Sequence, residues 1–403
     1  MSKEINYYDT FATNLGTLDQ RINHATGLSG KDQLLEVMDT KSKNTALDIL
    51  LENECNQNCI GCYFQEHDGK GAIKVTKEMV EDIRQMIQVL KPDDPDLFMF
   101  YPREITTSPQ LLSVYTEEGM DRVLTNGKLL HKDGVIKKLK EFGIKRISIT
   151  VSGRREVYSM YTREPADTYD QLLSNISLAI KSGFSISIFM PVFKQNIDDV
   201  IPTVLDLYLR GVPDIKFLRV VPEGQAKTLP DEMFLNHEDI LKFLRNVNNI
   251  RHKVGNKMNL GLFTGYFGPN FYNFNTYKYL SGEISRWPKS KYFCPMINQQ
   301  YVGVSFGSND VYSCFASLSF PEDFKIGKYE NGTLKYSKQP ISSDWLNKNL
   351  RGLCSKENCE EQEICLGGCR VIPFSWAKRK GENDPITSGQ DFCLTQTLKE
   401  IGA

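Results

Sequence analysis

Short apolar runs rich in Ile, Val and Phe alternate with segments of helical period between Thr45 and about Gly224. This alternation is typical of repeated βα units that build a parallel sheet. Six such units indicate a partial (β/α)6 barrel, with functional groups at the carboxyl ends of the strands. The predicted strands are Ala46–Leu51, Leu97–Tyr101, Arg122–Thr125, Arg146–Val151, Ser185–Met190 and Ile215–Val221. The predicted helices between them include Lys77–Leu90, Lys132–Phe142, Tyr169–Lys181 and Ile197–Arg210.

The pattern changes after Gly224, where a helix predicted at His237–His252 leads into an aromatic-rich stretch. Ten of the 28 residues from Tyr266 to Phe293 are aromatic, which fits either a packed connector or a wall that lines a substrate. From Cys294 onward turn residues and cysteines dominate, which predicts a small α+β domain that needs metal to fold. The expected division is an N-terminal extension (1–44), the barrel (45–229), a bridging segment (230–293) and the cysteine-rich domain (294–403).

Composition limits the classes of partner. The 403 residues suffice for two or three domains of about 150 residues each. The formal net charge of -1 argues against a nucleic-acid partner and against an anionic membrane surface. No apolar run approaches the roughly 18 residues of a membrane-spanning helix. The N-terminus lacks the basic-then-apolar pattern of a secretory signal, so we expect a cytoplasmic protein.

The ten cysteines carry the strongest chemical signal, because disulfides are rare in cytoplasmic proteins. They form two groups separated by more than 230 residues, which indicates two functional regions. The first group is Cys55, Cys59 and Cys62, and the second is Cys294, Cys314, Cys354, Cys359, Cys365, Cys369 and Cys393.

The first group places three thiols within eight residues, close enough to hold one inorganic centre from a single loop. A [4Fe-4S] cluster held by three cysteines keeps one iron open to a cofactor. A structural zinc site needs four ligands, and His67 could be the fourth ligand of a Cys3His site. Three buried structural thiols are the remaining alternative.

The spacing Cys-x3-Cys-x2-Cys after the first strand of a βα repeat resembles the radical S-adenosylmethionine (SAM) superfamily. The resemblance implies a [4Fe-4S] cluster whose open iron is chelated by the amino and carboxylate groups of SAM. It implies that one electron, from a flavodoxin- or ferredoxin-type reductant, cleaves SAM to a 5'-deoxyadenosyl radical that abstracts hydrogen from the substrate. The cofactor supplies this chemistry, while the protein supplies orientation and exclusion of water.

The same resemblance nominates residues for binding SAM. Glu104 matches the Glu of the family's Gly-Gly-Glu-Pro motif, although Pro102 and Arg103 replace the glycines. An Arg at the position of Arg163 often pairs with the SAM carboxylate. The full set that the resemblance nominates for the cofactor is Glu104, Thr125, Asn126, Thr150, Arg163 and Tyr63. Each polar residue of this set could instead be an ordinary loop residue or a cap at the end of a strand.

Two further segments depart from the usual motif or extend it. The aromatic residue that commonly precedes the third cysteine is Gly61 here, so Tyr63 or Phe64 is expected to stack on the adenine instead. The segment 220–224, Val-Val-Pro-Glu-Gly, resembles the family's strand-end segment beside SAM, with an ordinary turn as the alternative.

The second cysteine group resembles the SPASM extension of radical SAM enzymes, which holds two auxiliary [4Fe-4S] clusters. The first spacing, Cys354-x4-Cys359, is two residues longer than usual, and Asn309 stands where a glycine is common. Asn tolerates a left-handed backbone, so the turn can form. The resemblance assigns Cys354, Cys359, Cys365 and Cys393 to a distal cluster, and Cys294, Cys314 and Cys369 to a proximal cluster with one open or non-cysteine position. A zinc ribbon is the alternative for this group.

Three functions follow from these assignments. The first is a radical SAM/SPASM oxidoreductase with three [4Fe-4S] clusters that matures a ribosomally made precursor peptide, by a thioether or carbon–carbon crosslink. The second is an enzyme that oxidises or rearranges a small molecule such as a sugar, an aminoglycoside or a cofactor precursor. The third is a non-catalytic iron–sulfur electron carrier. The sequence indicates no catalytic acid, base or radical relay.

Overall fold

The computed structural model describes residues 46–64, 73–91, 98–262, 272–273, 278–279, 301–312, 315–337, 369 and 371–381. The chain divides into two compact units, each made from separate stretches of sequence. One contains residues up to Leu51, the stretch Glu81–Tyr101 and the stretch Gly282–Asp391. The other contains Glu52–Val80, Pro102–Ser281 and the last residues of the chain.

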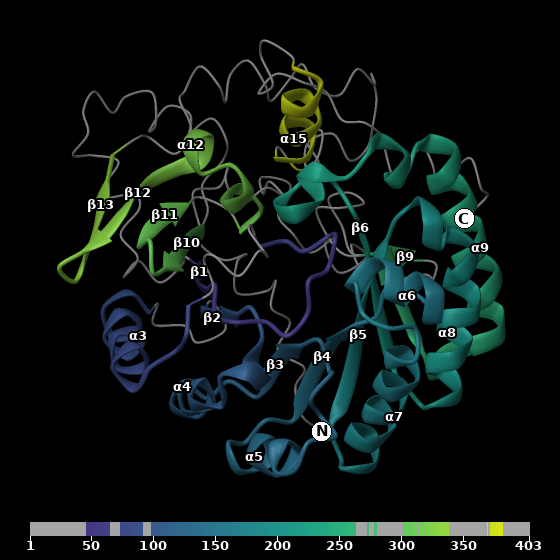
Figure 1. Ribbon diagram of the computed structural model, residues 1–403, viewed down its shortest axis with the longest axis horizontal. Coiled ribbons are helices and arrows are strands. Elements are labelled where there is room, and N and C mark those ends of the chain that lie inside the picture. The colour runs from purple at the N-terminus through teal and green to yellow at the C-terminus, as the bar shows by residue number, and fades with distance from the viewer. Residues whose placement is uncertain are drawn as a thin grey trace. The chain divides into compact units, whose positions relative to one another are not determined.

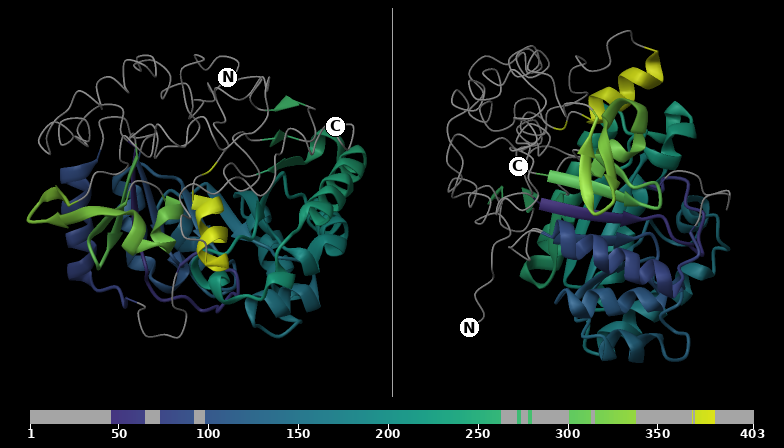
Figure 2. Two further views of the ribbon diagram at one scale, coloured as in Figure 1. Left: turned by 90° about the horizontal axis from the view of Figure 1, so that it is seen from above. Right: turned by 90° about the vertical axis from the view of Figure 1, so that its left-hand side faces the viewer.

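The first unit is built on a six-stranded sheet with the order β13-β12-β11-β10-β1-β2. Strand β1 pairs in parallel with β10, from Ala46 opposite Tyr301 to Leu51 opposite Phe306, so segments 250 residues apart lie side by side (Figure 1; Figure 2, right). The pairs from β10 to β13 are antiparallel. The strands are β1 (Ala46–Leu51), β2 (Phe98–Pro102), β10 (Tyr301–Phe306), β11 (Asp310–Tyr312), β12 (Lys325–Glu330) and β13 (Thr333–Tyr336).

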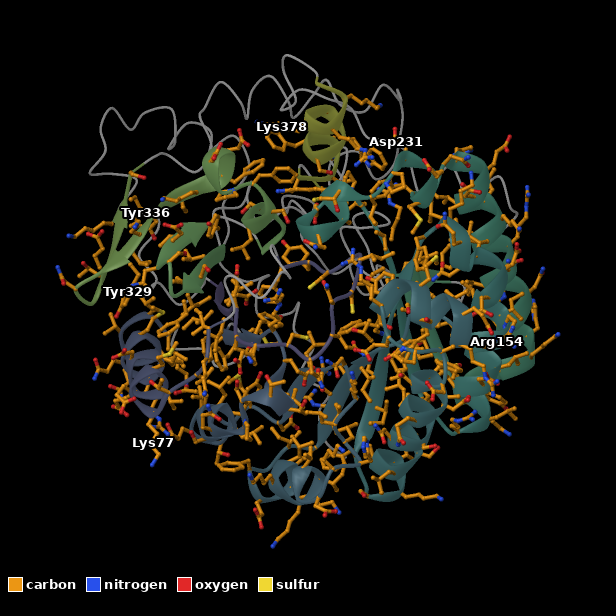
Figure 3. All side chains as sticks on the ribbon, in the orientation of Figure 1. Lys77, Arg154, Asp231, Tyr329, Tyr336 and Lys378 are labelled. Carbon is orange, nitrogen blue, oxygen red and sulfur yellow. The ribbon has the colours of Figure 1, made fainter. Side chains whose placement is uncertain are left out.

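Three helices accompany this sheet in sequence: α3 (Lys77–Leu90), α12 (Pro321–Phe324) and α15 (Val371–Lys380). Phe374 of α15 packs edge-on against Phe320 and Phe324, with ring centroids 5.1 and 4.7 Å apart. These aromatic contacts and the buried face of α15 form a small apolar core in the first unit. Tyr329 and Tyr336 lie on the β12–β13 hairpin (Figure 3).

The second unit is built on a seven-stranded sheet with the order β3-β4-β5-β6-β7-β8-β9, in which β3 to β7 are parallel. Buried Ile, Val and Phe side chains along β4, β5 and β6 give this sheet its core. Its strands are β3 (Arg122–Thr125), β4 (Arg146–Thr150), β5 (Ser185–Val192), β6 (Asp214–Arg219), β7 (Asn259–Leu262), β8 (Tyr272–Asn273) and β9 (Lys278–Tyr279).

Helices connect these parallel strands (Figure 1). In α7 and α9 the apolar side chains are buried. Helix α7 contacts β5, and α8 packs on α9. The helices are α4 (Leu112–Glu117), α5 (Val135–Glu141), α6 (Arg155–Thr162), α7 (Thr168–Lys181), α8 (Val200–Leu209) and α9 (His237–Val254). Short 3-10 turns include η3 (Ile105–Thr107), η5 (Lys194–Asp199) and η6 (Gly224–Thr228). Among the described helices, none is both long and apolar enough to cross a membrane.

All six predicted strands are present, and the alternation of strand and helix is confirmed. Several bounds were wrong. Helix α5 begins at Val135 rather than Lys132, because Gly134 adopts a left-handed backbone with φ of 82°. Helix α8 begins at Val200, since residues 194–199 form the turn η5. Helix α6 was not predicted.

The strands predicted for one barrel belong to two hydrogen-bonded sheets, because β10 takes the parallel position beside β1 while β3 to β6 pair among themselves. The α/β fold with a parallel sheet is therefore confirmed. The partial (β/α)6 barrel stays a prediction, as do the predicted domain limits. The N-terminal extension and most of the stretch 266–293 lie outside the described residues.

Asn196, in η5, ties the ends of two neighbouring strands together. Its Nδ2 donates to the carbonyls of Ser152 and Pro191 at 2.8 and 2.7 Å, and its Oδ1 accepts from the Phe193 backbone N–H at 2.9 Å. The Asn196 side chain is buried, so water cannot replace these bonds.

We predict that Asn196→Ala lowers the free energy of unfolding by about 2–4 kcal/mol, because three buried backbone groups lose their partner. Urea denaturation followed by circular dichroism measures the change. Gln195→Ala is the matched control: its exposed amide makes one contact, to the Glu232 carbonyl, and its loss should cost less than about 0.5 kcal/mol. Equal effects of the two changes would contradict this role of Asn196.

Candidate metal and cofactor site

The cysteine loop, residues 52–64, follows β1 along the chain and carries Cys55, Cys59 and Cys62. A turn in which the Cys62 N–H donates to the Cys59 carbonyl at 3.1 Å holds the backbones of these two residues close together. All three thiols are half-buried and form no disulfide. The loop therefore carries three free thiols within one short polypeptide segment.

Backbone hydrogen bonds hold the loop against two other elements of the second unit. The Ile60 N–H donates to the carbonyl of Tyr161 in α6 at 2.8 Å, and the Gln225 N–H donates to the Cys62 carbonyl at 2.8 Å. Gly224 lies directly against the loop: a Cβ at this position would be 2.2 Å from the Tyr63 carbonyl oxygen. Its φ of 51° also lies in the left-handed region. The close approach of η6 to the cysteine loop therefore requires glycine.

Tyr161 fills the space that a side chain at Gly61 would take. A Cβ at Gly61 would lie 2.6 Å from the Tyr161 hydroxyl oxygen and 2.9 Å from its Cε2. The Tyr161 ring is buried and stacks on Phe193 with centroids 5.3 Å apart, so it cannot swing aside. An aromatic ring thus does border the third cysteine, but it comes from α6 rather than from the loop.

Asn53 joins the start of the cysteine loop to the segment after β2. Its Nδ2 donates to the Glu104 carbonyl at 2.7 Å and to the Ser108 hydroxyl at 3.2 Å. Its Oδ1 accepts from the Arg103 backbone N–H at 2.7 Å. Asn53 is fully buried, so the positions of Arg103 and Glu104 relative to the loop are fixed by one amide.

Glu104 is buried and accepts hydrogen bonds from the protein's own groups. Its Oε1 accepts from the Thr106 backbone N–H at 2.9 Å and from the Thr125 hydroxyl at 2.6 Å, and its Oε2 accepts from the Asn126 N–H at 2.7 Å. Burial raises the pKa of Glu104 although these donors favour the charged form. Three of the nominated residues, Glu104, Thr125 and Asn126, are therefore brought together at the end of β3.

Asn126 connects this cluster to the cysteine loop. Its Nδ2 lies 2.6 Å from the Asn56 Oδ1 and 3.8 Å from the Cys55 sulfur. The backbone N–H of Lys128 donates to the Asn126 Oδ1 at 2.9 Å and fixes the orientation of the amide. The amide of Asn126 is thus directed toward Cys55 and Asn56 of the cysteine loop.

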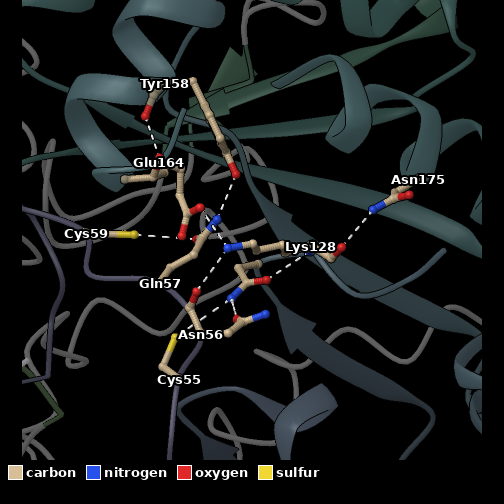
Figure 4. A network of polar contacts seen from close by, with 10 residues as sticks. Cys55, Asn56, Gln57, Cys59, Lys128, Tyr158, Glu164 and Asn175 are labelled. Atoms are coloured by element: carbon tan, nitrogen blue, oxygen red, sulfur yellow. Dashed lines mark hydrogen bonds and ion pairs between the residues drawn. The ribbon is translucent and has the colours of Figure 1, made fainter. Parts of the chain in front are cut away.

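A second set of polar contacts surrounds Cys59 (Figure 4). The Gln57 Nε2 donates to the Tyr158 hydroxyl at 2.8 Å, and the Cys59 thiol lies 3.6 Å from the Gln57 Oε1. Lys128 forms an ion pair with Glu164 at 2.7 Å. These contacts join the loop to α6 and to the segment that follows β3.

Without a bound metal, burial favours the protonated thiol form of these cysteines over the thiolate. Burial raises the pKa of Cys55 to about 11, and the carboxylate of Glu104 adds to the effect. Burial also raises the pKa of Cys59 and of Cys62, the neighbouring thiols adding to it for Cys59. Metal binding needs deprotonated sulfur. Because water does not reach these sulfurs to stabilise the thiolates, a cationic centre bound here would have to stabilise them instead.

The residues present fit an iron–sulfur cluster with a bound cofactor. The thiols of Cys55 and Cys62 both contribute to raising the pKa of Cys59, so the three side chains lie in one neighbourhood. Asn56 Nδ2 and Asn58 Oδ1 are buried without a hydrogen-bond partner among the described residues. These two atoms are therefore available to hydrogen-bond to a further group. In the described parts of the chain, no three His, Cys, Asp or Glu side chains gather around a position for a single metal ion.

The other nominated residues lie differently. Thr150 ends β4 and is half-buried. Arg163 caps α6 with a left-handed backbone, φ 59°, and is exposed, while its neighbour Glu164 reaches Lys128. Tyr63 packs edge-on against Phe64, with centroids 6.4 Å apart. Within the described part of the chain, neither Thr150 nor Arg163 hydrogen-bonds to the cysteines of the loop, and the roles of all three residues toward SAM stay predictions.

Only Cys369 of the second cysteine group lies within the described residues, half-buried and two residues before α15. The predicted roles of Cys294, Cys314, Cys354, Cys359, Cys365 and Cys393 fall outside them. The left-handed backbone expected at Asn309 is observed, with φ of 57°, in the turn between β10 and β11.

Sequence reasoning missed several residues that shape the site. Asn53, Gln57 and Tyr158 carry no motif signal, because their role depends on contacts with residues distant in sequence. Tyr161 could have been found, since glycine in place of an aromatic at position 61 indicates that another ring occupies the space.

Comparison with known families and proteins agrees with this geometry. Residues 49–207 match the model of the family described as the Radical SAM superfamily. The matched stretch includes the cysteine loop, Glu104, Asn126 and Arg163.

Two curated relatives come from Methanosarcina barkeri. Fe-coproporphyrin III synthase is 27% identical over 199 residues, which are 48% of this chain and 48% of the relative. AdoMet-dependent heme synthase is 22% identical over 347 residues, which are 82% of this chain and 92% of the relative. The first match therefore spans about half the length of the relative.

Solved structures share the fold at low identity. Native anSMEcpe with bound AdoMet has a TM-score of 0.59 and 16% identity, covering 88% of this chain and 95% of that one. Streptococcus suis SuiB bound to the precursor peptide SuiA has a TM-score of 0.57 and 15% identity, covering 91% of this chain and 80% of that one. At such identity the likeness concerns the fold alone.

We predict that Gly224→Ala lowers iron bound at the cysteine loop and destabilises the protein, because the added Cβ would overlap the Tyr63 carbonyl. Iron per chain after anaerobic reconstitution, together with the urea midpoint, measures both effects. The matched control is Gly211→Ala: its φ of 81° imposes similar backbone strain, about 1–2 kcal/mol, but nothing lies within 4 Å of the new Cβ. Iron loss in both variants alike would show that backbone strain, rather than the close approach, is responsible.

Proposed function

We propose that the radical SAM domain of residues 49–207 makes this chain a radical SAM enzyme, with Cys55, Cys59 and Cys62 holding a [4Fe-4S] cluster. The observation that carries the proposal is a loop of three thiols held by hydrogen bonds to α6 and η6, beside Asn126 and the buried Glu104. SAM bound at the open iron would supply the radical that abstracts hydrogen from the substrate. The chain's own residues hold and orient the ligands and keep water away.

The contacts of these residues indicate a separate role for each. Asn53 fixes the Glu104 segment to the loop, and Glu104 in turn fixes the backbone of Asn126. Asn126 reaches the Cys55 sulfur, so an amide donor is available to the cluster or to the cofactor. Arg163, Thr150 and Tyr63 complete the proposed SAM contacts on the strength of the family resemblance.

We extend the proposal to two auxiliary [4Fe-4S] clusters in a SPASM domain. The support is the spacing of the seven later cysteines and the left-handed backbone of Asn309. This backbone conformation fits the resemblance, because SPASM domains commonly have glycine at that position. The proximal cluster would use Cys294, Cys314 and Cys369, so that one iron can meet the substrate or receive its electron. A reducing compartment such as the cytoplasm and a flavodoxin- or ferredoxin-type donor would keep the clusters active.

For the substrate we propose a ribosomally made precursor peptide. The fold shared with SuiB, which has been solved with its precursor peptide, supports this class. The open position inferred at the proximal cluster suits a thiol-bearing side chain, because thiolates are strong ligands for iron. Thioether or carbon–carbon crosslinking would then be the outcome.

A second candidate is a small-molecule substrate of the tetrapyrrole class. The observation that favours it is the similarity to Fe-coproporphyrin III synthase and AdoMet-dependent heme synthase, the second across most of both chains. Both candidates use the same cysteine loop, so they differ in the substrate and not in the cofactor.

We predict that Cys59→Ala reduces 5'-deoxyadenosine formation to the background rate, since two thiols cannot hold the cluster at this loop. Cys369→Ala should retain SAM cleavage but lose the modified product, because Cys369 belongs to the other cysteine group. Chromatographic quantitation of 5'-deoxyadenosine and of product in reconstituted, dithionite-reduced enzyme measures both. Equal loss of the two activities in both variants would contradict separate roles.

We predict that 5'-deoxyadenosine rises in the wild-type enzyme when a cysteine-containing peptide encoded beside the gene is added with SAM and dithionite. Iron-coproporphyrin III, supplied at the same concentration, should leave the rate unchanged. A rise with the porphyrin and not with the peptide would reject the peptide and support the second candidate.

A further inference from the structure

Lys128 joins the segment after β3 to two other parts of the second unit (Figure 4). Its Nζ forms an ion pair with the Glu164 Oε2 at 2.7 Å and donates to the Asn56 carbonyl at 3.4 Å. Asn56 directly follows the first cysteine of the loop, and Glu164 lies two residues after the end of α6. One ammonium group therefore connects the cysteine loop to the segment that follows α6.

The backbone of Lys128 is held by two side-chain amides. The Nδ2 of Asn175 in α7 donates to the carbonyls of Gly127 and Lys128 at 2.9 and 3.1 Å. The Lys128 N–H donates to the Asn126 Oδ1 at 2.9 Å. Asn175 is buried, so water cannot replace its bonds. The Lys128 side chain thus reaches the cysteine loop from a backbone that is fixed in place.

The ion pair between Lys128 and Glu164 is partly withdrawn from water. The side chain of Lys128 is 29% exposed and that of Glu164 is 16% exposed. Partial burial strengthens such a pair, because fewer water molecules and ions screen the two charges. The pair between Arg155 and Asp170, by contrast, has side chains that are 60% and 49% exposed, and exposed pairs contribute little. We therefore expect the Lys128–Glu164 pair to hold a fixed geometry.

Arg163, the residue between α6 and Glu164, has an unfavourable backbone conformation. Its φ of 59° is left-handed, which crowds the Cβ of any residue other than glycine. Its N–H donates to the Ser159 carbonyl at 2.8 Å, and the next side chain is held by Lys128. The Arg163 side chain is exposed and, in the described part of the chain, pairs with no carboxylate. The main chain that carries this guanidinium is therefore held on both sides.

We propose that Lys128 and Glu164 are positioning residues whose ion pair holds the Arg163 segment against the cysteine loop. The inference rests on the proposed function, in which the loop carries the cluster and Arg163 contacts the SAM carboxylate. The pair touches no reacting atom and acts through the Asn56 backbone and through Arg163. Its loss should weaken SAM binding and leave the chemical step unchanged, because the groups that bind SAM would no longer be held at a fixed separation.

The test is anaerobic calorimetric titration of reconstituted full-length enzyme with SAM, without reductant so that SAM stays intact. Lys128→Met and Glu164→Gln should each raise the dissociation constant of SAM about tenfold. The double variant should bind no more weakly than either single variant, because both changes break the same ion pair. Lys128→Arg keeps the charge and should stay within about threefold of the wild type. With dithionite and saturating SAM, kcat for 5'-deoxyadenosine formation should stay within about twofold while KM rises.

Arg155→Met is the matched control. Arg155 also lies in α6, and its ion pair with Asp170 at 3.1 Å joins that helix to α7 rather than to the cysteine loop. Its loss should leave the dissociation constant within about twofold of the wild type. Iron per chain is measured on every sample, so that incomplete cluster loading is separated from weaker SAM binding.

The outcomes separate the two proposals. Absence of SAM binding in the iron-loaded wild type overturns the proposed function and this inference with it. Binding that is equally tight in wild type, Lys128→Met and Glu164→Gln overturns the role of the ion pair alone. Weaker binding in Lys128→Met but not in Glu164→Gln would mean that Lys128 contacts SAM directly, which also overturns the positioning role. An equal loss in Arg155→Met, or a loss of iron without a change in SAM affinity, overturns it as well.

Discussion

The whole site depends on holding three cysteines of one short loop in a fixed shape. A free loop could present its thiols in many arrangements, and ordering it costs about 1–2 kcal/mol per residue. Backbone hydrogen bonds to α6 and η6 and the hydrogen bonds of the buried Asn53 amide offset this loss of entropy. The loop is fixed by elements that come from distant parts of the sequence, so the positions of its three cysteines depend on the fold of the second unit.

The parallel strands and the cysteine motif could be predicted because both are local patterns. Hydrophobic periodicity located all six strands, and the spacing of Cys55, Cys59 and Cys62 indicated the family whose model matches residues 49–207. Pairing between β1 and β10 could not be predicted, since it joins segments 250 residues apart and leaves no periodic signal. The same holds for Gly224, whose need for glycine arises from the neighbouring Tyr63 backbone and not from its own turn alone.

Departures from the usual motif have physical explanations in this structure. Gly61 lacks an aromatic side chain because Tyr161 already occupies that space. Arg103 replaces a small residue and places its guanidinium carbon 5.8 Å from the centre of the Phe64 ring. Glu104 keeps its place in the motif, yet its carboxylate accepts bonds from Thr106, Thr125 and Asn126. The chain thus builds the surroundings of the cysteines from different residues while the cysteines themselves keep the family spacing.

The central claim is that three thiolates leave one iron open and that SAM occupies it. Electron–nuclear double resonance of the reduced wild-type protein with SAM carrying ¹⁵N in its amino group tests this directly. The account predicts a ¹⁵N coupling to the cluster, strong enough to place the amino nitrogen on an iron atom. A reduced cluster that shows no such coupling in the presence of saturating SAM would contradict it.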